Sequence, residues 1–356
     1  MTLAPAAEEQ VAWEASIDDE LTTFFDRHQQ RVNLHGLAYS RLWDAARRST
    51  LHGKRIRPAL VLNTYRAFGG TRESDAAAVA VSFELLHTAF LLHDDVIDGD
   101  TVRRGRDNLI GEFAADAQSG GMRDTRVMEW GRASAILAGD LLLHSAGARV
   151  ARLDIAPACR NALIDLLEDS LFVTAAGELY DVAYATNVHT PVLSEVLTMT
   201  EWKTAHYSFQ APLRAGALLA DAPQTALDAL DEYGRCVGIA FQLRDDLLGV
   251  FGDEDETGKS LRSDLGGTKM TALLIHAMHT GEADELRSIL GRPTIGDSEV
   301  KRARAVFERC GARSFVERMI AEQITRAQAV LGRHPLPGSL TDYLMVVADR
   351  AGRRVS

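Results

Sequence analysis

The chain has 356 residues, of which 46% are hydrophobic and 25% are charged, and its net charge at pH 7 is −11. This acidity argues against general binding to nucleic acid or to anionic membranes, because both require a basic surface. The three cysteines lie far apart, which indicates neither a disulfide framework nor a zinc site and favours a reducing cytoplasm. Residues 1–10 lack the basic and apolar regions of a signal peptide, and we expect a disordered tail there.

Helical periodicity runs through nearly all of residues 11–356, whereas the alternation typical of strands is hard to find. Neither a repeat of fixed period nor a Pro/Gly/Ser linker divides this range, so we expect one all-α domain built as a large antiparallel helical bundle. We expect helices at 11–33, 37–49, 56–69, 74–98, 131–153, 157–184, 191–220, 224–250, 268–279, 297–311, 313–331 and 339–351, with a weakly patterned stretch at 107–130 and a loop at 252–267.

The most apolar stretch, 76–92, contains Glu84 and His87. It is too short and too polar to span a bilayer, so we interpret it as a buried core helix. The protein is therefore not expected to be an integral membrane protein.

Three aspartates, Asp94, Asp95 and Asp98, follow this apolar stretch. Asp94 and Asp98 are four residues apart and share a helix face, with Asp95 beside them. Carboxylates this close repel one another unless a cation lies among them, and Mg²⁺ binds in this way with water and substrate phosphates as its other ligands. A solvated acidic helix end is the alternative, although acidic groups favour the opposite end of a helix.

Basic residues come directly after this cluster. Arg103 and Arg104 suit a diphosphate, because guanidinium groups bind phosphate in a fork. A surface salt bridge to the same aspartates is the alternative. Cations also gather at Lys54, Arg55 and Arg57, and Lys203 lies in an otherwise apolar helix; each of these alone could be a solvated cation.

A second aspartate cluster, Asp245 and Asp246, shares a helix face with Gln242 and Gly249. A glycine-rich stretch follows it and carries further charged residues: Asp253, Lys259, Asp264 and Lys269. Two acidic helix ends, each followed by basic residues, predict a multi-metal clamp on one diphosphate.

In combination, these motifs resemble the trans-prenyl diphosphate synthase (polyprenyl synthetase) family, and within it the geranylgeranyl diphosphate synthases most. The matching pieces, in chain order, are G-K-R-I-R-P (53–58), H-T-A-F-L-L-H-D-D-V-I-D (87–98), R-R-G (103–105), G-E-L-Y-D (177–181), K-T-A (203–205), F-Q-L-R-D-D (241–246), T-G-K (257–259) and D-L-G-G-T-K (264–269).

The resemblance implies a homodimeric, all-helical enzyme with a central cavity that condenses isopentenyl diphosphate head to tail with an allylic diphosphate. It implies Mg²⁺ held by Asp94, Asp98 and Asp245. It assigns the isopentenyl diphosphate site to Lys54, Arg57, His87 and Arg104, and the allylic diphosphate to Arg103, Lys203, Thr204, Gln242, Lys259 and Lys269. The catalytic set that it implies is Asp94, Asp95, Asp98, Arg103, Lys203, Asp245 and Asp246.

Two positions depart from the family pattern. The second motif usually ends on an aspartate where this chain has Gly249, so one potential ligand is missing, and Asp253 or Asp264 could replace it through water. Glu178 stands where the family often has glutamine, which adds negative charge near the cavity.

Two residues before the first motif, Ala89 and Phe90, match the family positions that set product length. Phe90 lies one helical turn before Asp94 on the same face, whereas an effect of Ala89 follows from the resemblance alone. One small residue and one aromatic residue predict a C20 product, geranylgeranyl diphosphate, with C15 or a longer chain as the alternative.

Three other functions stay open at this point. A terpene cyclase shares the aspartate-rich helix but needs no isopentenyl diphosphate site. A non-catalytic partner subunit is favoured only by Gly249. A helical binding module with acidic patches requires every motif match to be accidental.

Overall fold

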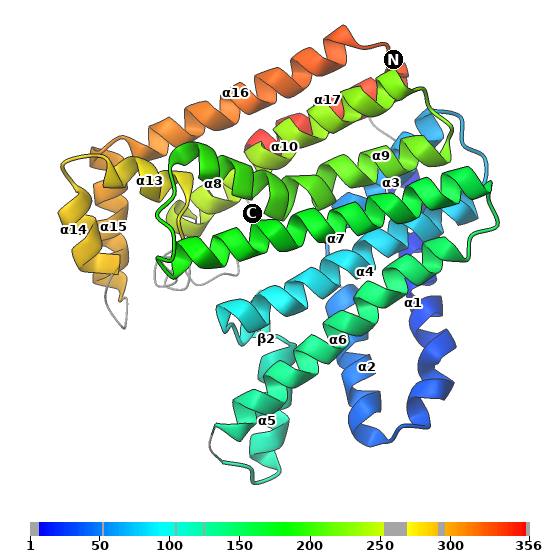
Figure 1. The fold of residues 1–356 in the computed structure, drawn as a ribbon, viewed down its shortest axis with the longest axis horizontal. Coiled ribbons are helices and arrows are strands. Elements are labelled where there is room, and N and C mark those ends of the chain that lie inside the picture. The colour runs from blue at the N-terminus through cyan, green and yellow to red at the C-terminus, as the bar shows by residue number, and fades with distance from the viewer. Residues whose placement is uncertain are drawn as a thin grey trace. The chain divides into compact units, whose positions relative to one another are not determined.

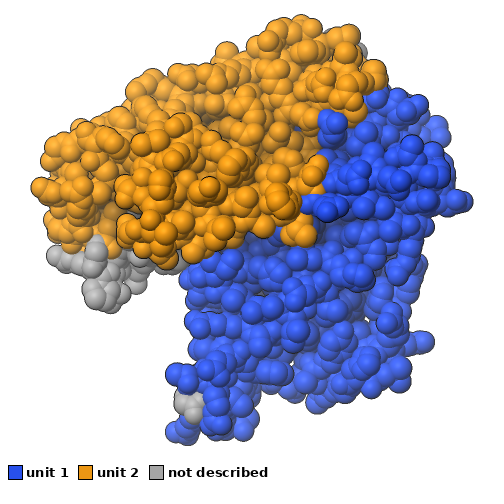
Figure 2. Space-filling model, in the orientation of Figure 1, with its two compact units in different colours: residues 1–168, 212–222 blue, residues 169–211, 223–356 orange. Residues whose placement is uncertain are grey.

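The computed structural model describes residues 7–51, 53–103, 105–123, 125–252, 269–290 and 296–353. These residues form two compact units, coloured blue and orange in Figure 2. Unit 1 comprises residues 1–168 and 212–222, and unit 2 comprises residues 169–211 and 223–356. The expectation of a single domain over 11–356 stays a prediction.

Unit 1 contains the helices up to the first part of α7 (Pro157–Ala185), together with most of α9 (Ala211–Leu219) (Figure 1). They are α1 (Ala7–Asn33), α2 (Leu37–Leu51), α3 (Ile56–Ala67), α4 (Glu73–Asp98), α5 (Leu109–Ser119), α6 (Arg126–Ala151), the first part of α7 and most of α9. A two-residue hairpin, β1 (Val102–Arg103) and β2 (Arg106–Asp107), joins α4 to α5.

Helix α4 forms the centre of unit 1 and packs against α3 and α6. Its apolar run contains no glycine or proline, and the helix ends at Gly99, whose φ of +73° gives the left-handed C-cap that glycine favours. A Cβ at Gly139 of α6 would overlap the ring of His93, so the lack of a side chain lets these two helices approach closely. The last turn of α4, which carries the first aspartates, is therefore held against α6.

The composition of α4 alone would let it cross a membrane, since an 18-residue window within its 26 residues has a mean hydropathy of 1.5. However, 72% of that window is buried inside the protein. Its Glu84 carboxylate forms an ion pair with the buried guanidinium of Arg55 at 2.7 Å. These contacts support the interpretation of 76–92 as part of a core helix.

Unit 2 contains the rest of α7 together with α8 (Leu193–Thr200), the π-helix η1 (Glu201–Gln210), α10 (Gln224–Phe251), α13 (Ala272–Met278), α14 (Ala283–Leu290), α15 (Asp297–Arg309), α16 (Ala312–Arg333) and α17 (Gly338–Arg353). Helix α10 packs against η1, α16 and α17. Its fully buried Tyr233 donates a hydrogen bond to the Leu344 carbonyl at 2.6 Å. At the C-terminal end of α10, Arg304 donates to the carbonyls of Val250 and Gly252 at 2.6 and 2.8 Å, which satisfies backbone acceptors that a helix end leaves open.

Most expected helices are present, with three differences. Helix α1 begins at Ala7, so residues 7–10 belong to it and only 1–6 of the expected tail lie outside the described residues. Helices α5 and α14 were not expected. The expected helix at 191–220 is a succession of α8, η1 and α9, with π geometry in the middle. The loop at 252–267 lies almost wholly outside the described residues.

Candidate active site

The first aspartate cluster occupies the last turn of α4, and its central member is tied to an arginine. Asp95 is only 2% exposed. Arg103, on β1, directs its Nε and Nη2 atoms to Asp95 Oδ1 at 2.9 and 2.5 Å, and Nη2 also contacts Asp94 Oδ2 at 3.2 Å. The structure therefore shows the salt bridge that the sequence left open as the alternative role of Arg103, and a phosphate contact of Arg103 stays a prediction.

The β1–β2 hairpin places Arg103 at this position. Gly105 has a φ of +71°, the left-handed conformation that glycine adopts freely in a tight turn. Asn108 then fixes the hairpin to the end of α4, because its side chain donates to the Asp100 carbonyl at 2.8 Å and accepts from the Gly111 amide as the N-cap of α5. Arg104, in the same turn, lies outside the described residues.

Burial and charge act in opposite directions on this ion pair. Burial raises the pKa of Asp95 to about 6, although the adjacent guanidinium of Arg103 lowers it. Burial alone would lower the pKa of Arg103, but the carboxylates of Asp95 and Asp94 raise it above its usual range. Arg103 is therefore a permanent cation at the base of the cluster, while Asp94 and Asp98 are more open to solvent than Asp95.

One face of α4, here called the α4 stripe, carries residues with predicted roles in substrate binding, product length and metal binding. His87, Phe90, Asp94 and Asp98 follow one another at spacings of three or four residues, and so lie on one face of the helix. His87 and Phe90 are half-buried, while Ala89 is completely buried. The helix therefore places the aromatic ring of Phe90 on the face that carries the aspartates, as expected.

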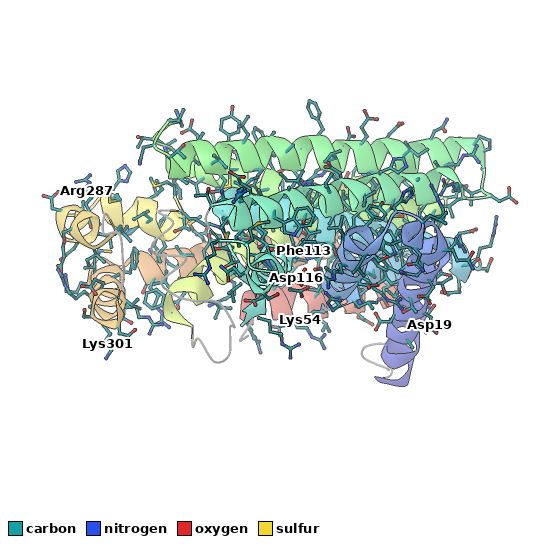
Figure 3. The ribbon with its side chains drawn as sticks, turned by 90° about the horizontal axis from the view of Figure 1, so that it is seen from below. Asp19, Lys54, Phe113, Asp116, Arg287 and Lys301 are labelled. Carbon is teal, nitrogen blue, oxygen red and sulfur yellow. The ribbon has the colours of Figure 1, made fainter. Side chains whose placement is uncertain are left out.

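The basic segment at the start of α3 divides into residues of two kinds. Lys54 is exposed (Figure 3) and Arg57 is half-buried. Arg55, between them, is 5% exposed, forms ion pairs with Glu84 and Asp18 at 2.7 Å each, and donates to the carbonyls of α2. Its φ of +50° turns the backbone before α3. Arg55 is thus a structural cation, whereas Lys54 and Arg57, the predicted diphosphate ligands on either side of it, are less buried.

In unit 2, the second aspartate cluster belongs to a chain of hydrogen bonds. Thr204 Oγ1 donates to Gln242 Oε1 at 3.0 Å, and Gln242 Nε2 donates to Asp246 Oδ1 at 2.8 Å. Asp245 is half-buried beside this chain, and Gly249 is buried one turn further along α10. Hydrogen bonds therefore link Thr204 of the K-T-A motif to Gln242 and Asp246 of the F-Q-L-R-D-D motif.

Lys203 is held by two carboxylates of α7. Its Nζ lies 2.6 Å from Asp181 Oδ2 and 2.9 Å from Glu178 Oε2. Glycines allow the close packing behind it, because a Cβ at Gly177 would overlap the Lys203 backbone and a Cβ at Gly238 would overlap Ala205. The glycine of G-E-L-Y-D is the sequence signal for this crossing, but sequence reasoning did not connect Glu178 and Asp181 with Lys203.

The described residues contain no group of three or more His, Cys, Asp or Glu side chains arranged to hold a metal ion. In unit 1, the carboxylates of Asp94 and Asp98 fit an ion that takes one or two protein ligands and completes its shell with water and phosphate oxygens, as Mg²⁺ does. In unit 2, the carboxylate of Asp245 is a ligand of the same kind. Lys269 is half-buried, and three other predicted positions, Asp253, Lys259 and Asp264, lie outside the described residues.

Comparison with known proteins agrees with these motifs. A family model described as Polyprenyl synthetase matches residues 40–307. A short chain isoprenyl diphosphate synthase of Methanothermobacter thermautotrophicus is 34% identical over 283 residues, which cover 78% of this chain and 80% of the relative. A (2E,6E)-farnesyl diphosphate synthase of Mycobacterium tuberculosis is 33% identical over 308 residues, which cover 84% of this chain and 80% of the relative.

The fold also matches solved structures. Geranylgeranyl pyrophosphate synthase from Corynebacterium glutamicum, complexed with isoprenyl diphosphate and magnesium, has a TM-score of 0.89 and 28% identity, with 96% of this chain and 98% of that chain covered. This match confirms the predicted all-α fold of the isoprenoid synthase type. The chain belongs to the polyprenyl synthetase family and is a prenyltransferase with trans-prenyl diphosphate synthase activity.

Proposed function

We propose that this synthase is a Mg²⁺-dependent, cytoplasmic homodimer that extends an allylic diphosphate with isopentenyl diphosphate to the C20 product, geranylgeranyl diphosphate. The observation that carries the product length is the α4 stripe, in which half-buried Phe90 precedes Asp94 by one turn on the same face. An aromatic side chain there limits the depth available to a growing chain anchored at the aspartates. The structural similarity to a geranylgeranyl pyrophosphate synthase supports the same length.

Charged side chains of both aspartate motifs are proposed to bind the diphosphates. Asp94, Asp98 and Asp245 would hold Mg²⁺, with Asp95 and Asp246 as neighbours. Bound there, Mg²⁺ supplies positive charge to the leaving diphosphate. The magnesium in the Corynebacterium glutamicum structure supports this choice of metal.

The remaining residues are proposed to bind the two substrates. The isopentenyl diphosphate site is formed by Lys54, Arg57, His87 and Arg104. The allylic diphosphate is bound by Arg103, Lys203, Thr204, Gln242, Lys259 and Lys269. Cleavage of the allylic C–O bond leaves negative charge on the diphosphate, which fixed cations stabilise. The carbocation then needs apolar walls that exclude water until the isopentenyl double bond attacks.

Exposed apolar side chains support a dimer. Phe172 and Leu179 are 78% and 69% exposed, and their spacing of seven residues places them on one face of α7. A contiguous exposed apolar patch marks a protein–protein contact. A second copy of the chain is the partner that the family resemblance implies.

A farnesyl product is the second candidate, because the Mycobacterium tuberculosis relative is a farnesyl diphosphate synthase at 33% identity. Incubation of the purified protein with labelled isopentenyl diphosphate, Mg²⁺ and dimethylallyl, geranyl or farnesyl diphosphate separates the two candidates. A C20 product, including from the farnesyl primer, supports the proposal. Termination at C15, with farnesyl diphosphate left unextended, overturns it.

A further inference from the structure

We infer that Glu178 competes with the allylic diphosphate for Lys203, and thereby sets how tightly the enzyme holds that substrate and its elongated product. The inference rests on the proposed role of Lys203 as an allylic diphosphate ligand. Glu178 is a positioning residue in this scheme, because it acts on the substrate through Lys203.

The geometry limits where the Lys203 ammonium can lie. Asp181 and Glu178 are three residues apart on α7 and contact Nζ from one helix face, at 2.6 and 2.9 Å. The three side chains are between 12% and 19% exposed, so water screens their attraction less than it does at the surface. Because Gly177 has no side chain, α7 packs directly against the Lys203 backbone. Both carboxylates of α7 therefore lie within reach of the Lys203 ammonium.

The carboxylates of this cluster compete with a diphosphate for the same ammonium. Asp181 and Glu178 both contact Lys203 Nζ, at 2.6 and 2.9 Å. An ammonium has three N–H donors, and two of them point at Asp181 and Glu178. An incoming diphosphate must therefore share Lys203 with Glu178 or displace that contact.

The substitution Glu178→Gln would separate the hydrogen bond that this side chain makes to Lys203 from its negative charge. Its carbonyl oxygen can still accept a hydrogen bond from Lys203, so the lysine stays in place, but the negative charge is gone. Substrate and product carry the same diphosphate, so a tighter grip on one is a tighter grip on the other. Glu178 would consequently favour product release, a step that limits turnover in many enzymes.

The experiment compares the wild type with Glu178→Gln. Binding of inorganic diphosphate in the presence of Mg²⁺ is measured by calorimetry, and KM is measured for the allylic diphosphate and for isopentenyl diphosphate separately. We expect the Kd for diphosphate and the KM for the allylic substrate to fall about threefold to tenfold, as for the loss of one partly screened charge. The KM for isopentenyl diphosphate should stay within twofold, roughly the error of such constants.

Glu201→Gln is the matched control, because it removes the same charge at the start of η1, where the carboxylate faces Arg235 at 3.9 Å. It should leave all three constants unchanged. In a Lys203→Met background, Glu178→Gln should have no further effect on diphosphate binding, because Glu178 is inferred to act on the diphosphate through Lys203.

Unchanged binding in Glu178→Gln, or an equal gain in Glu201→Gln, overturns the inference while leaving the synthase activity intact. A gain that persists in the Lys203→Met background also overturns it, since the charge then acts without Lys203. Loss of condensation in the wild type itself would instead refute the proposed function. Calorimetry measures diphosphate binding independently of condensation, so it distinguishes a failure of the proposed function from a failure of the inference.

Discussion

Arg103 holds the buried carboxylate of Asp95 by two contacts to the same oxygen, Nε at 2.9 Å and Nη2 at 2.5 Å. Burial and the positive charge act on Asp95 in opposite directions, and burial is the larger effect. The pair fixes the β1–β2 hairpin to the last turn of α4. Asp94 and Asp98 thereby keep a defined orientation on the outer side of that turn.

Removal of Arg103 should therefore destabilise the protein. In Arg103→Leu the Asp95 carboxylate, which is only 2% exposed, loses the guanidinium that pairs with it, and we expect a loss of about 3–5 kcal/mol in the free energy of unfolding. Urea unfolding measures it. The control is Arg106→Leu, since Arg106 is exposed on β2 and should cost less than about 0.5 kcal/mol. Equal unfolding midpoints for the two variants would show that the Arg103–Asp95 ion pair contributes no more to the free energy of unfolding than an exposed arginine does.

Product length should respond to Phe90. Truncation in Phe90→Ala opens space one turn below Asp94, and we expect products longer than C20 by at least one isoprene unit. Chromatography of dephosphorylated products measures the length. Phe68→Ala makes the same change in the same unit, at the C-cap of α3 and outside the α4 stripe, and should leave the product unchanged. A Phe90→Ala enzyme whose products keep the wild-type length would show that Phe90 does not limit product length.

The exposed apolar face of α7 should be needed for association. Phe172→Glu and Leu179→Glu place charges where a second copy is proposed to pack, and each should shift the protein towards the monomer in light scattering. Leu34→Glu is the control, because Leu34 is 83% exposed between α1 and α2 and lies far from α7 in the chain. A wild-type monomer, or a dimer that tolerates both α7 charges, contradicts the homodimer proposal.

His206 on η1 should contribute to acid sensitivity. Burial lowers the pKa of its imidazole, despite the opposing charge of Asp169. The unfolded chain then binds a proton more readily than the folded one, so stability from this group is present above the unfolded pKa of about 6.5 and is lost as pH falls below it.

The measurement is urea unfolding of the wild type and of His206→Gln at about pH 7.5 and about pH 5.5, on either side of the ordinary histidine pKa. The loss of stability between the two should be smaller in His206→Gln. The exposed His35 provides His35→Gln as a control with the wild-type loss. Identical losses in all three proteins would mean that folding leaves the pKa of His206 unchanged.

The sequence predicted the elements that carry the strongest patterns. Helix α4 was clear from an apolar run without glycine or proline, and α10 from its apolar periodicity. Helix α5 was missed because glycine and aspartate obscure its period, although the N-cap Asn108 was a usable signal. The π geometry of η1 was invisible, since a ten-residue change of pitch barely alters a helical pattern.

The site was predictable in composition but not in its internal contacts. The motifs gave the residues of both aspartate clusters in order. The resemblance left Arg55 out of the diphosphate ligands, but the sequence did not reveal its buried ion pair, because the partner Glu84 lies 29 residues further along the chain. The bridge from Glu178 and Asp181 to Lys203 likewise depends on a helix crossing, and only the glycine at 177 marks it in the sequence.

The most direct test of the proposed function is condensation by the purified protein, with labelled isopentenyl diphosphate and farnesyl diphosphate, in Mg²⁺ and after its removal by chelation. We predict a C20 product in Mg²⁺, none after chelation, and recovery when Mg²⁺ is restored. Condensation that persists without a divalent ion, or a protein that extends no allylic primer in Mg²⁺, would contradict it.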